Sequence, residues 1–288
     1  NGGAEWPSAA VSATADDAAA FIAASDGKPF FVNVWLHESH TPHFPTPESL
    51  ERWKGLDERQ RVYAAVITDG DAAVGKILAA LRAAGVEKNT LVMFSSDNGP
   101  EITGPGQPAV VHDDDAAVRG YNASCSVGET GGLRGRKRSL FEGGVRVPFL
   151  VRWPGHAPAG LKNDTTVFTA VDLLPTLCAA AGVALPADYR GDGENLLAAL
   201  DGKLVKRTRP IHWQWKGGAG GPDLWPRLAV RDGDWKLLLD FRLAADRGET
   251  KNVAAEHGDV VARLSAMAIE WRDSLPTKPD PACTESSK

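Results

Sequence analysis

The sequence predicts an α/β protein: a mostly parallel central sheet flanked by helices, followed by a small antiparallel sheet with a packed helix. Two observations lead to this prediction. In the first part of the chain, short apolar runs that end at polar or Gly-Pro turns alternate with helical patterns, which is typical of βα units. Later runs follow one another at hairpin spacing. We therefore expect two domains, over residues 1–205 and 206–288.

The chain opens with features of a helix, a strand and a loop, in this order. Thr14–Asp17 offer capping side chains for an Ala-rich helix. Phe30–Leu36 is rich in aromatic and β-branched residues, which favours a strand. The prolines of His37–Pro45 then force an extended loop.

A long helix and a buried strand follow this loop. An apolar stripe predicts a helix over residues 57–84, and Gly85 suits the position just beyond its end. Leu91–Phe94 is a run of four apolar residues, as in a strand buried on both faces. It stops at the polar turn Ser95–Pro100. Because ligands bind at the carboxyl ends of strands in open α/β sheets, this turn is a candidate site.

The remaining elements complete the predicted fold. We expect a strand over 147–153, a helix over 172–182, strands over 211–215, 228–231 and 235–239, and a final helix over 260–275. The Asp-Gly-Asp turn at 232–234 predicts a hairpin between the last two strands. We expect the long loop 100–138 and the Trp213–Trp225 stretch to line a cleft.

Composition excludes several classes of protein. The formal net charge of -5 argues against a general nucleic-acid binder. No apolar run reaches the roughly 18 residues that span a membrane, and no signal-peptide pattern is present. The three cysteines are far apart, which favours neither a zinc site nor a disulfide framework.

The turn after the buried run carries the first candidate ligands. The Asp97 carboxylate and the Asn98 amide carbonyl are hard oxygen donors, suited to Ca²⁺ or Mg²⁺. The alternative is a turn in which both side chains only cap backbone N–H groups. These residues alone favour the alternative, whereas the motifs described next favour the metal.

Four motifs stand in a fixed order: Glu38–Pro42, Ser96–Gly99, Arg136–Pro148 and Trp153–Gly155. They resemble the sulfatase family of the alkaline phosphatase superfamily, in which x-P-H-x-P, S-D-N-G, G-K-x-x-x-x-E-G-G-x-R-V-P and W-P-G segments follow one another. The segments at 171–177, 232–237 and 248–252 match the family as well. The resemblance covers nearly the whole chain and implies an alkaline phosphatase-like fold.

The resemblance implies roles for individual residues. Asp97 and Asn98 match the pair that binds a divalent cation, usually Ca²⁺, with Mg²⁺ as an alternative. Lys137 matches the lysine that contacts a sulfate oxygen, a role that a compact ammonium suits. The alternative for Lys137 is a solvated charge in a basic run.

A histidine is expected on the leaving-group side of the sulfate. His40 matches it and could donate a proton to the departing alkoxide. His43 is the alternative for this substrate-binding role, and His37 is a third candidate. A lone histidine in a loop is more often a hydrogen-bonded surface residue.

One part of the family pattern is missing from this sequence. Sulfatases carry their nucleophile, a formylglycine, in an N-terminal C-x-P-x-R or S-x-P-x-R motif, which this chain lacks. It also lacks the N-terminal Asp-Asp metal pair. The chain therefore resembles the C-terminal portion of a sulfatase, and we expect a complementary N-terminal chain. Without one, exposed strand edges and apolar surface should make the chain associate.

The resemblance implies hydrolysis of sulfate esters, of aryl or carbohydrate type, once the N-terminal part is present. One alternative is a phosphodiesterase or phosphonate hydrolase of the same superfamily. Another is an inactive half that binds a sulfated glycan or a partner chain. By the same resemblance, the protein is expected to be secreted, periplasmic or lysosomal-like.

Overall fold

A computed structural model describes residues 10–101, 120–121, 123–215, 227–239, 242–244 and 248–278. Most of the predicted cleft-lining segments, 102–119 and 216–226, lie outside the described residues. The chain divides into two compact units: Asn1–Gly131 with Val147–Leu161, and Gly132–Arg146 with Lys162–Lys288. The predicted domain boundary between residues 205 and 206 stays a prediction.

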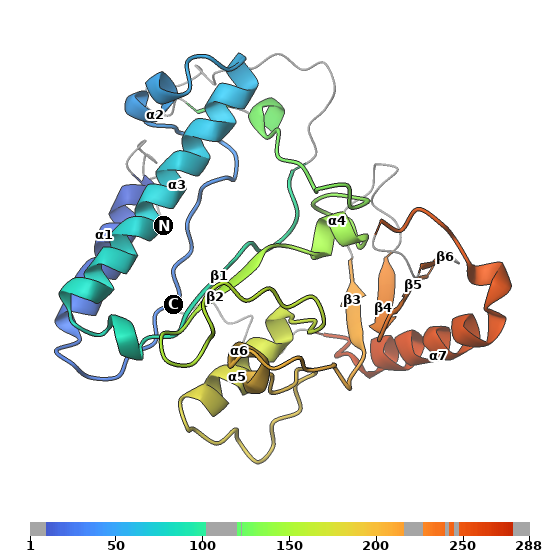
Figure 1. Ribbon diagram of the computed structural model, residues 1–288. Helices are drawn as coiled ribbons and strands as arrows, with labels where there is room; N and C mark the ends of the chain where they lie inside the picture. The colour runs from blue at the N-terminus through green and yellow to red at the C-terminus, as the bar shows by residue number, and fades with distance from the viewer. Residues whose placement is uncertain are drawn as a thin grey trace. The chain divides into compact units, whose positions relative to one another are not determined.

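Helices dominate the first unit. Helix α1 (Ala10–Ala24) lies beside the long helix α3 (Glu58–Ala83), and the short helix α2 (Pro47–Arg52) also packs on α3 (Figure 1). Ala15 and Ala73 are buried where α1 meets α3, because their small side chains let two helices approach closely.

The ends of α3 agree with the prediction. The Asp57 carboxylate accepts hydrogen bonds from the backbone N–H groups of Arg59 and Gln60, which caps the first turn. Gly85 follows the helix with a φ of 71°, the left-handed conformation that ends many helices. A short 3-10 helix, η1 (Glu87–Asn89), leads into the next strand.

The predicted start of α1 is wrong. Thr14–Asp17 do not cap the helix but lie inside it, because α1 already begins at Ala10. Alanine has the highest helix propensity, so an Ala-rich segment extends past internal capping residues. The Asp16 carboxylate pairs with Lys76 of α3 at 2.7 Å instead.

The first unit contains a two-stranded sheet. Strand β1 (Val92–Ser95) pairs antiparallel with β2 (Phe149–Arg152), with Val92 opposite Arg152. Within the described residues of the first unit, β1 and β2 are the two strands that pair, and they are antiparallel. The parallel pairing expected from the sequence is therefore not seen in this part of the chain. The strand predicted over Phe30–Leu36 is not formed, because this extended segment has no ladder partner in the described part of the chain. The prediction that β1 is buried on both faces is wrong, since Phe94 is 46% exposed.

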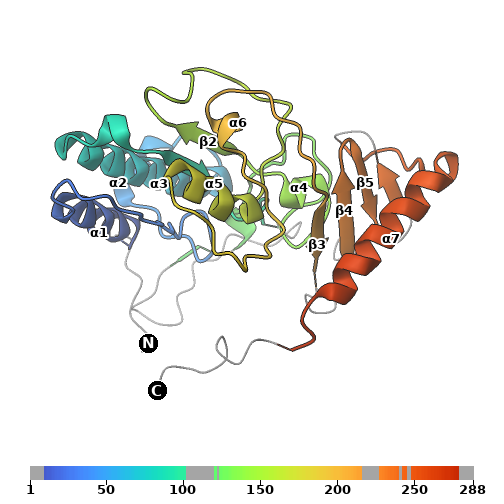
Figure 2. The ribbon, with the colours of Figure 1, turned by 90° about the horizontal axis from the view of Figure 1, so that it is seen from below.

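The second unit contains the predicted antiparallel sheet and helix. Strands β3 (Ile211–Gln214), β4 (Leu228–Asp232), β5 (Trp235–Leu238) and β6 (Arg242–Ala244) follow one another in order. Helix α7 (Gly258–Ser274) packs across the sheet (Figure 2). The apolar core between them includes Val230, Leu237 and Leu264. The prediction of an antiparallel sheet with a packed helix is therefore confirmed.

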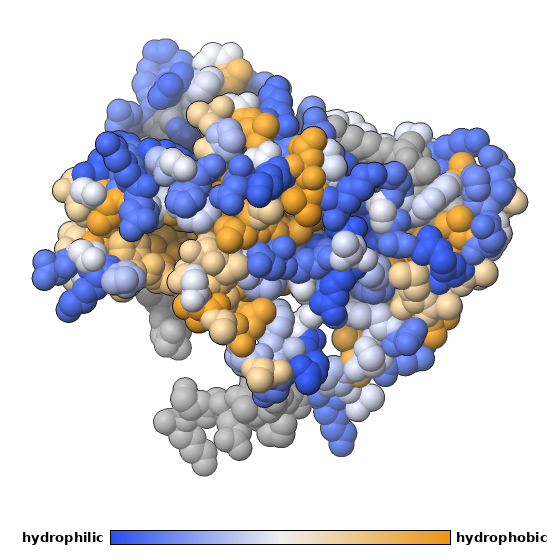
Figure 3. All heavy atoms as spheres, turned by 60° about the horizontal axis from the view of Figure 1, so that its bottom comes forward, coloured by the Kyte–Doolittle hydropathy of each residue, from blue (hydrophilic) through white to orange (hydrophobic). Residues whose placement is uncertain are grey.

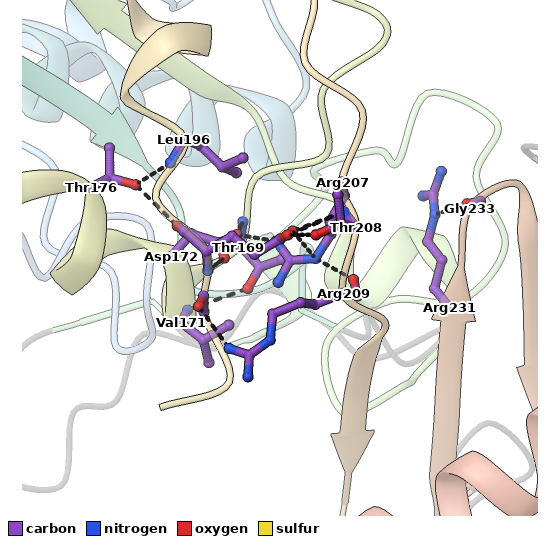
Figure 4. Close-up of polar contacts among 12 residues, drawn as sticks. Thr169, Val171, Asp172, Thr176, Leu196, Arg207, Thr208, Arg209, Arg231 and Gly233 are labelled. Carbon is purple, nitrogen blue, oxygen red and sulfur yellow. Dashed lines mark hydrogen bonds and ion pairs between the residues drawn. The ribbon is translucent and has the colours of Figure 1, made fainter. Parts of the chain in front are cut away.

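Short helices complete the second unit: α4 (Glu142–Val145), η3 (Ala170–Asp172), α5 (Leu173–Ala180), α6 (Leu197–Leu200) and η4 (Ala254–Glu256). A further 3-10 turn, η2 (Ala123–Cys125), belongs to the first unit. Thr169 and Asp172 form a capping box at the start of η3 (Figure 4). This box fixes where the chain enters α5.

Candidate active site

His40 lies exposed in the proline-containing loop of the first unit. Its Nδ1 donates a hydrogen bond to the Thr41 carbonyl oxygen at 2.6 Å, since a carbonyl can only accept. The His37 ring meets the His40 ring edge-on, with centroids 5.7 Å apart. With Nδ1 committed to the backbone, Nε2 is the ring nitrogen that can exchange a proton with a ligand.

His43 lies in the interior of the first unit. Its Nε2 lies 2.9 Å from the Ser126 hydroxyl, and its side chain is almost fully buried. Its backbone N–H and C=O exchange hydrogen bonds with Tyr121. Burial, and then the charges of His37 and His40, lowers the pKa of His43 to about 4. The imidazole is therefore neutral at pH 7 and anchors the loop.

Two further titratable groups flank His40 in this loop. Burial, followed by the charge on His40, lowers the pKa of His37. Burial raises the pKa of Glu38, with a smaller contribution from Asp69. The Glu38 Oε2 is buried without a hydrogen-bond partner among the described residues. No role was predicted for Glu38, whose only signal in the sequence is a carboxylate in a proline-bounded loop after an apolar run.

Asp97 and Asn98 lie directly after β1, as predicted. The Ser96 hydroxyl donates to the Asn98 carbonyl oxygen at 2.9 Å, and the Ser95 hydroxyl donates to the Pro148 carbonyl oxygen at 3.0 Å. The Asp97 side chain is exposed, and no hydrogen bond or ion pair joins its carboxylate to another described residue. The Ser96 hydroxyl therefore bonds across the turn, and within the described residues the Asp97 carboxylate caps no backbone N–H group.

This donor set fits part of a hard-cation site. Ca²⁺ takes about six to eight oxygen ligands, of which Asp97 and Asn98 offer the carboxylate and the amide oxygen. Within the described residues, no three His, Cys, Asp or Glu side chains converge as a metal cluster. The remaining ligands of a cation here would have to be water, substrate or residues beyond those described.

Lys137 belongs to the second unit, in the turn that precedes α4. Gly143 and Gly144 shape this turn, because the backbone passes too close for a side chain. A Cβ on Gly143 would lie 2.2 Å from the Gly135 carbonyl oxygen, and one on Gly144 would lie 2.1 Å from that of Ser139. The two glycines thus allow the backbone of α4 to lie directly against the loop that carries Lys137.

The chain belongs to the sulfatase family. The sulfatase family model matches residues 8–183, more than half of the 288-residue chain. A second model, N-sulphoglucosamine sulphohydrolase, C-terminal, matches residues 130–259. The resemblance identified from ordered motifs is thereby confirmed.

Curated relatives agree with this assignment. An N-acetylgalactosamine-6-O-sulfatase of Bacteroides thetaiotaomicron is 30% identical over 266 residues, covering 87% of this chain and 48% of the relative. A steryl-sulfatase of Mus musculus is 34% identical, covering 92% of this chain and 45% of the relative. The chain thus spans about half the length of the curated relatives it matches.

Solved structures share the fold. Ps i-CgsB in complex with k-i-k-neocarrahexaose superposes with a TM-score of 0.73 at 26% identity, covering 91% of this chain and 54% of that one. A protein of the Bacteroides thetaiotaomicron locus for the metabolism of multiple glycosaminoglycans superposes with a TM-score of 0.71 at 26% identity. This match covers 92% of this chain and 55% of that one. The predicted α/β, alkaline phosphatase-like class is confirmed.

Proposed function

We propose that this chain forms the metal-binding and leaving-group part of a sulfatase that hydrolyses aryl or carbohydrate sulfate esters. The family match over residues 8–183 supports the reaction class. The observation that carries the proposal within the site is the Asp97 carboxylate, which lies exposed at a strand end and is not used to close its own turn.

Each side chain has a distinct role in this proposal. Asp97 and Asn98 would hold a divalent cation, Ca²⁺ or alternatively Mg²⁺, which would supply positive charge to stabilise the sulfate ester as it reacts. The Lys137 ammonium binds a sulfate oxygen. His40 donates a proton to the leaving alkoxide as the sulfur–oxygen ester bond breaks. Exposure favours His40 over the buried, neutral His43 for this step.

The nucleophile is assigned to a complementary amino-terminal portion, on the same longer polypeptide or on a separate chain. Exposed apolar residues of the first unit support this assignment (Figure 3). In the extended segment Phe30–Leu36, Phe31 is 72% exposed and Trp35 is 82% exposed. Both lie on the same side of an extended chain, which has no ladder partner among the described residues. Such an edge is suited to pairing with another strand.

The cellular compartment follows from the family alone. We place the complete enzyme in a secreted, periplasmic or lysosome-like compartment. No helix of the described residues has the length and apolar character needed to cross a membrane.

The test is to produce this chain together with an amino-terminal sulfatase segment that carries the formylglycine motif. Turnover of an aryl sulfate is then compared with turnover of an aryl phosphate diester. The proposal predicts a clear preference for the sulfate. A preference for the diester would favour a phosphodiesterase, and glycan binding without turnover would favour an inactive binding half.

A further inference from the structure

A buried charge cluster joins three residues of the second unit that are far apart in sequence. The Lys236 ammonium on β5 donates a hydrogen bond to Glu142 Oε1 at 2.8 Å and lies 3.0 Å from Glu249 Oε1. The Glu142 backbone N–H donates to Glu249 Oε2 at 2.6 Å. All three side chains are at most 6% exposed. One ammonium therefore holds two carboxylates in the interior.

The pKa values of the two carboxyl groups are shifted in opposite directions. Burial opposes ionisation of Glu142, but Lys236, Arg231 and Arg146 outweigh it and lower the pKa of Glu142. Burial raises the pKa of Glu249, and the favourable contribution of Lys236 does not offset it. Lys236 therefore favours the ionised form of Glu142 more effectively than that of Glu249, which also accepts from the first backbone amide of α4.

This cluster is connected to the loop of Lys137 through the backbone. Glu142 is the first residue of α4, and Gly143 and Gly144 follow it directly. The Gly143 N–H donates to the Arg134 carbonyl oxygen at 2.6 Å, at the start of the turn that carries Lys137. Both glycines also lie against the backbone of this turn, too close for a Cβ, so the position of Glu142 is linked to the turn by a hydrogen bond and by close backbone contact.

Apolar packing also holds the same segment. Leu140 and Phe141, between Lys137 and Glu142, pack against Ala229 of β4 and Leu238 of β5. The Arg134 guanidinium lies 4.2 Å from the centre of the Phe141 ring. The loop is therefore attached to the sheet by a buried salt bridge to Lys236 and by an apolar contact with Leu238, two residues further along β5.

We propose that Lys236 and Glu249 are positioning residues that hold the Lys137 turn in its sulfate-binding conformation. They act through Glu142 and touch no substrate. The proposal rests on the proposed role of Lys137 in sulfate binding, and it assigns to the small C-terminal sheet a direct part in shaping the active site.

The first test measures the turn itself, by hydrogen exchange of the full chain. We expect amides of residues 133–146 to exchange at least tenfold faster in K236M than in the wild type. The matched control is K251M, which removes a lysine from the exposed pair with Glu256. Far-UV circular dichroism establishes that each variant is folded. Should K236M not fold, E249A keeps Lys236 paired with Glu142 and removes the acceptor of the Glu142 amide together with the second carboxylate of the cluster. Unchanged exchange in a folded variant would overturn the proposal.

The second test separates positioning from general stability, with the completed enzyme and an aryl sulfate. We expect K236M to lower kcat/KM at least tenfold and K236R to restore most of it. Because Lys236 acts through Lys137, the double variant K137A/K236M should lose no more than K137A alone. Additive losses would overturn the positioning role. A fully active K137A would refute the proposed function itself. The hydrogen-exchange measurement tests separately whether Lys236 and Glu249 hold the turn in place.

Discussion

Arg207 and Asp172 form a buried ion pair in the second unit. Arg207 donates from Nη1 to Asp172 Oδ2 at 2.5 Å, and the two side chains are 7% and 0% exposed (Figure 4). The Asp172 carboxylate also accepts the backbone N–H groups of Thr169 and Glu194, both at 2.8 Å. One carboxylate therefore ties the start of α5 to the segments that follow it.

We predict that R207M strongly destabilises the protein. The substitution leaves the Asp172 carboxylate buried without its cation, which costs about 3–5 kcal/mol in comparable cases. Urea unfolding measures the change in the free energy of unfolding. The matched control is R263M, which breaks the exposed pair of Arg263 with Asp232 and should cost less than about 1 kcal/mol. Equal effects of the two substitutions would contradict this account.

Stability should depend on pH through His43. The pKa of His43 is lowered to about 4 in the folded chain, against about 6.5 in the unfolded chain. Between these pH values only the unfolded chain binds the proton, so the free energy of unfolding falls as the pH falls. The stabilisation is complete above pH 6.5, and up to about 3 kcal/mol is lost by pH 4.

Urea unfolding of H43Q between pH 7 and pH 4 checks this prediction. The slope of stability against pH should decrease. The slope that remains includes His37 and His212, whose pKa values are also lowered by burial, and the carboxyl groups with shifted pKa values, Glu38, Glu142, Glu194 and Glu249. The control H156Q removes an exposed histidine and should keep the wild-type slope. A wild-type slope in H43Q would show that His43 does not carry the effect.

The exposed apolar residues Phe31 and Trp35 should make the chain alone self-associate. Burying one such side chain contributes about 1.5–3 kcal/mol, so F31S/W35S should weaken association by at least roughly tenfold. Sedimentation velocity measures this change. The control L204S removes an apolar side chain that is 66% exposed elsewhere and should leave association unaltered. A monomeric wild-type chain would contradict the prediction.

Cation binding should depend on Asp97. Calorimetry with Ca²⁺ and Mg²⁺ should show affinity for the wild type and at least tenfold weaker binding for D97A, because the carboxylate is the charged donor. The control D71A removes an exposed carboxylate of α3. In the completed enzyme, a chelator should abolish turnover and added Ca²⁺ should restore it. Equal affinity of D97A and the wild type would exclude this site.

Local signals in the sequence were enough to predict many of the helices, strands and turns. Asp57 and Gly85 marked the ends of α3, and the Asp-Gly-Asp turn marked the β4–β5 hairpin. These features depend on residues close together in the chain. Strand β6, with three residues, had no periodicity to detect. The antiparallel pairing of β1 with β2 depends on strands more than fifty residues apart, which no local pattern specifies.

In the candidate site, too, features set by neighbouring residues were predicted, whereas features set by residues distant in the chain were not. The apolar run Leu91–Phe94 predicted that Asp97 and Asn98 follow a strand, which the structure confirms. The burial of His43 depends on Tyr121 and Ser126, which lie far along the chain. Lys236 and Glu249 lie 94 and 107 residues from Glu142. A single sequence carries no signal for such partners, so neither was predicted.

The most direct test of the central claim is sulfate release by the completed enzyme with K137A in place of the wild-type chain. The matched control is R138A, in the adjacent basic residue of the same turn. We predict that K137A lowers kcat/KM for an aryl sulfate by at least about a hundredfold, as expected for a lost oxyanion-binding charge, and that R138A changes it little. Equal turnover by K137A and the wild type would show that this chain does not supply the sulfate-binding lysine.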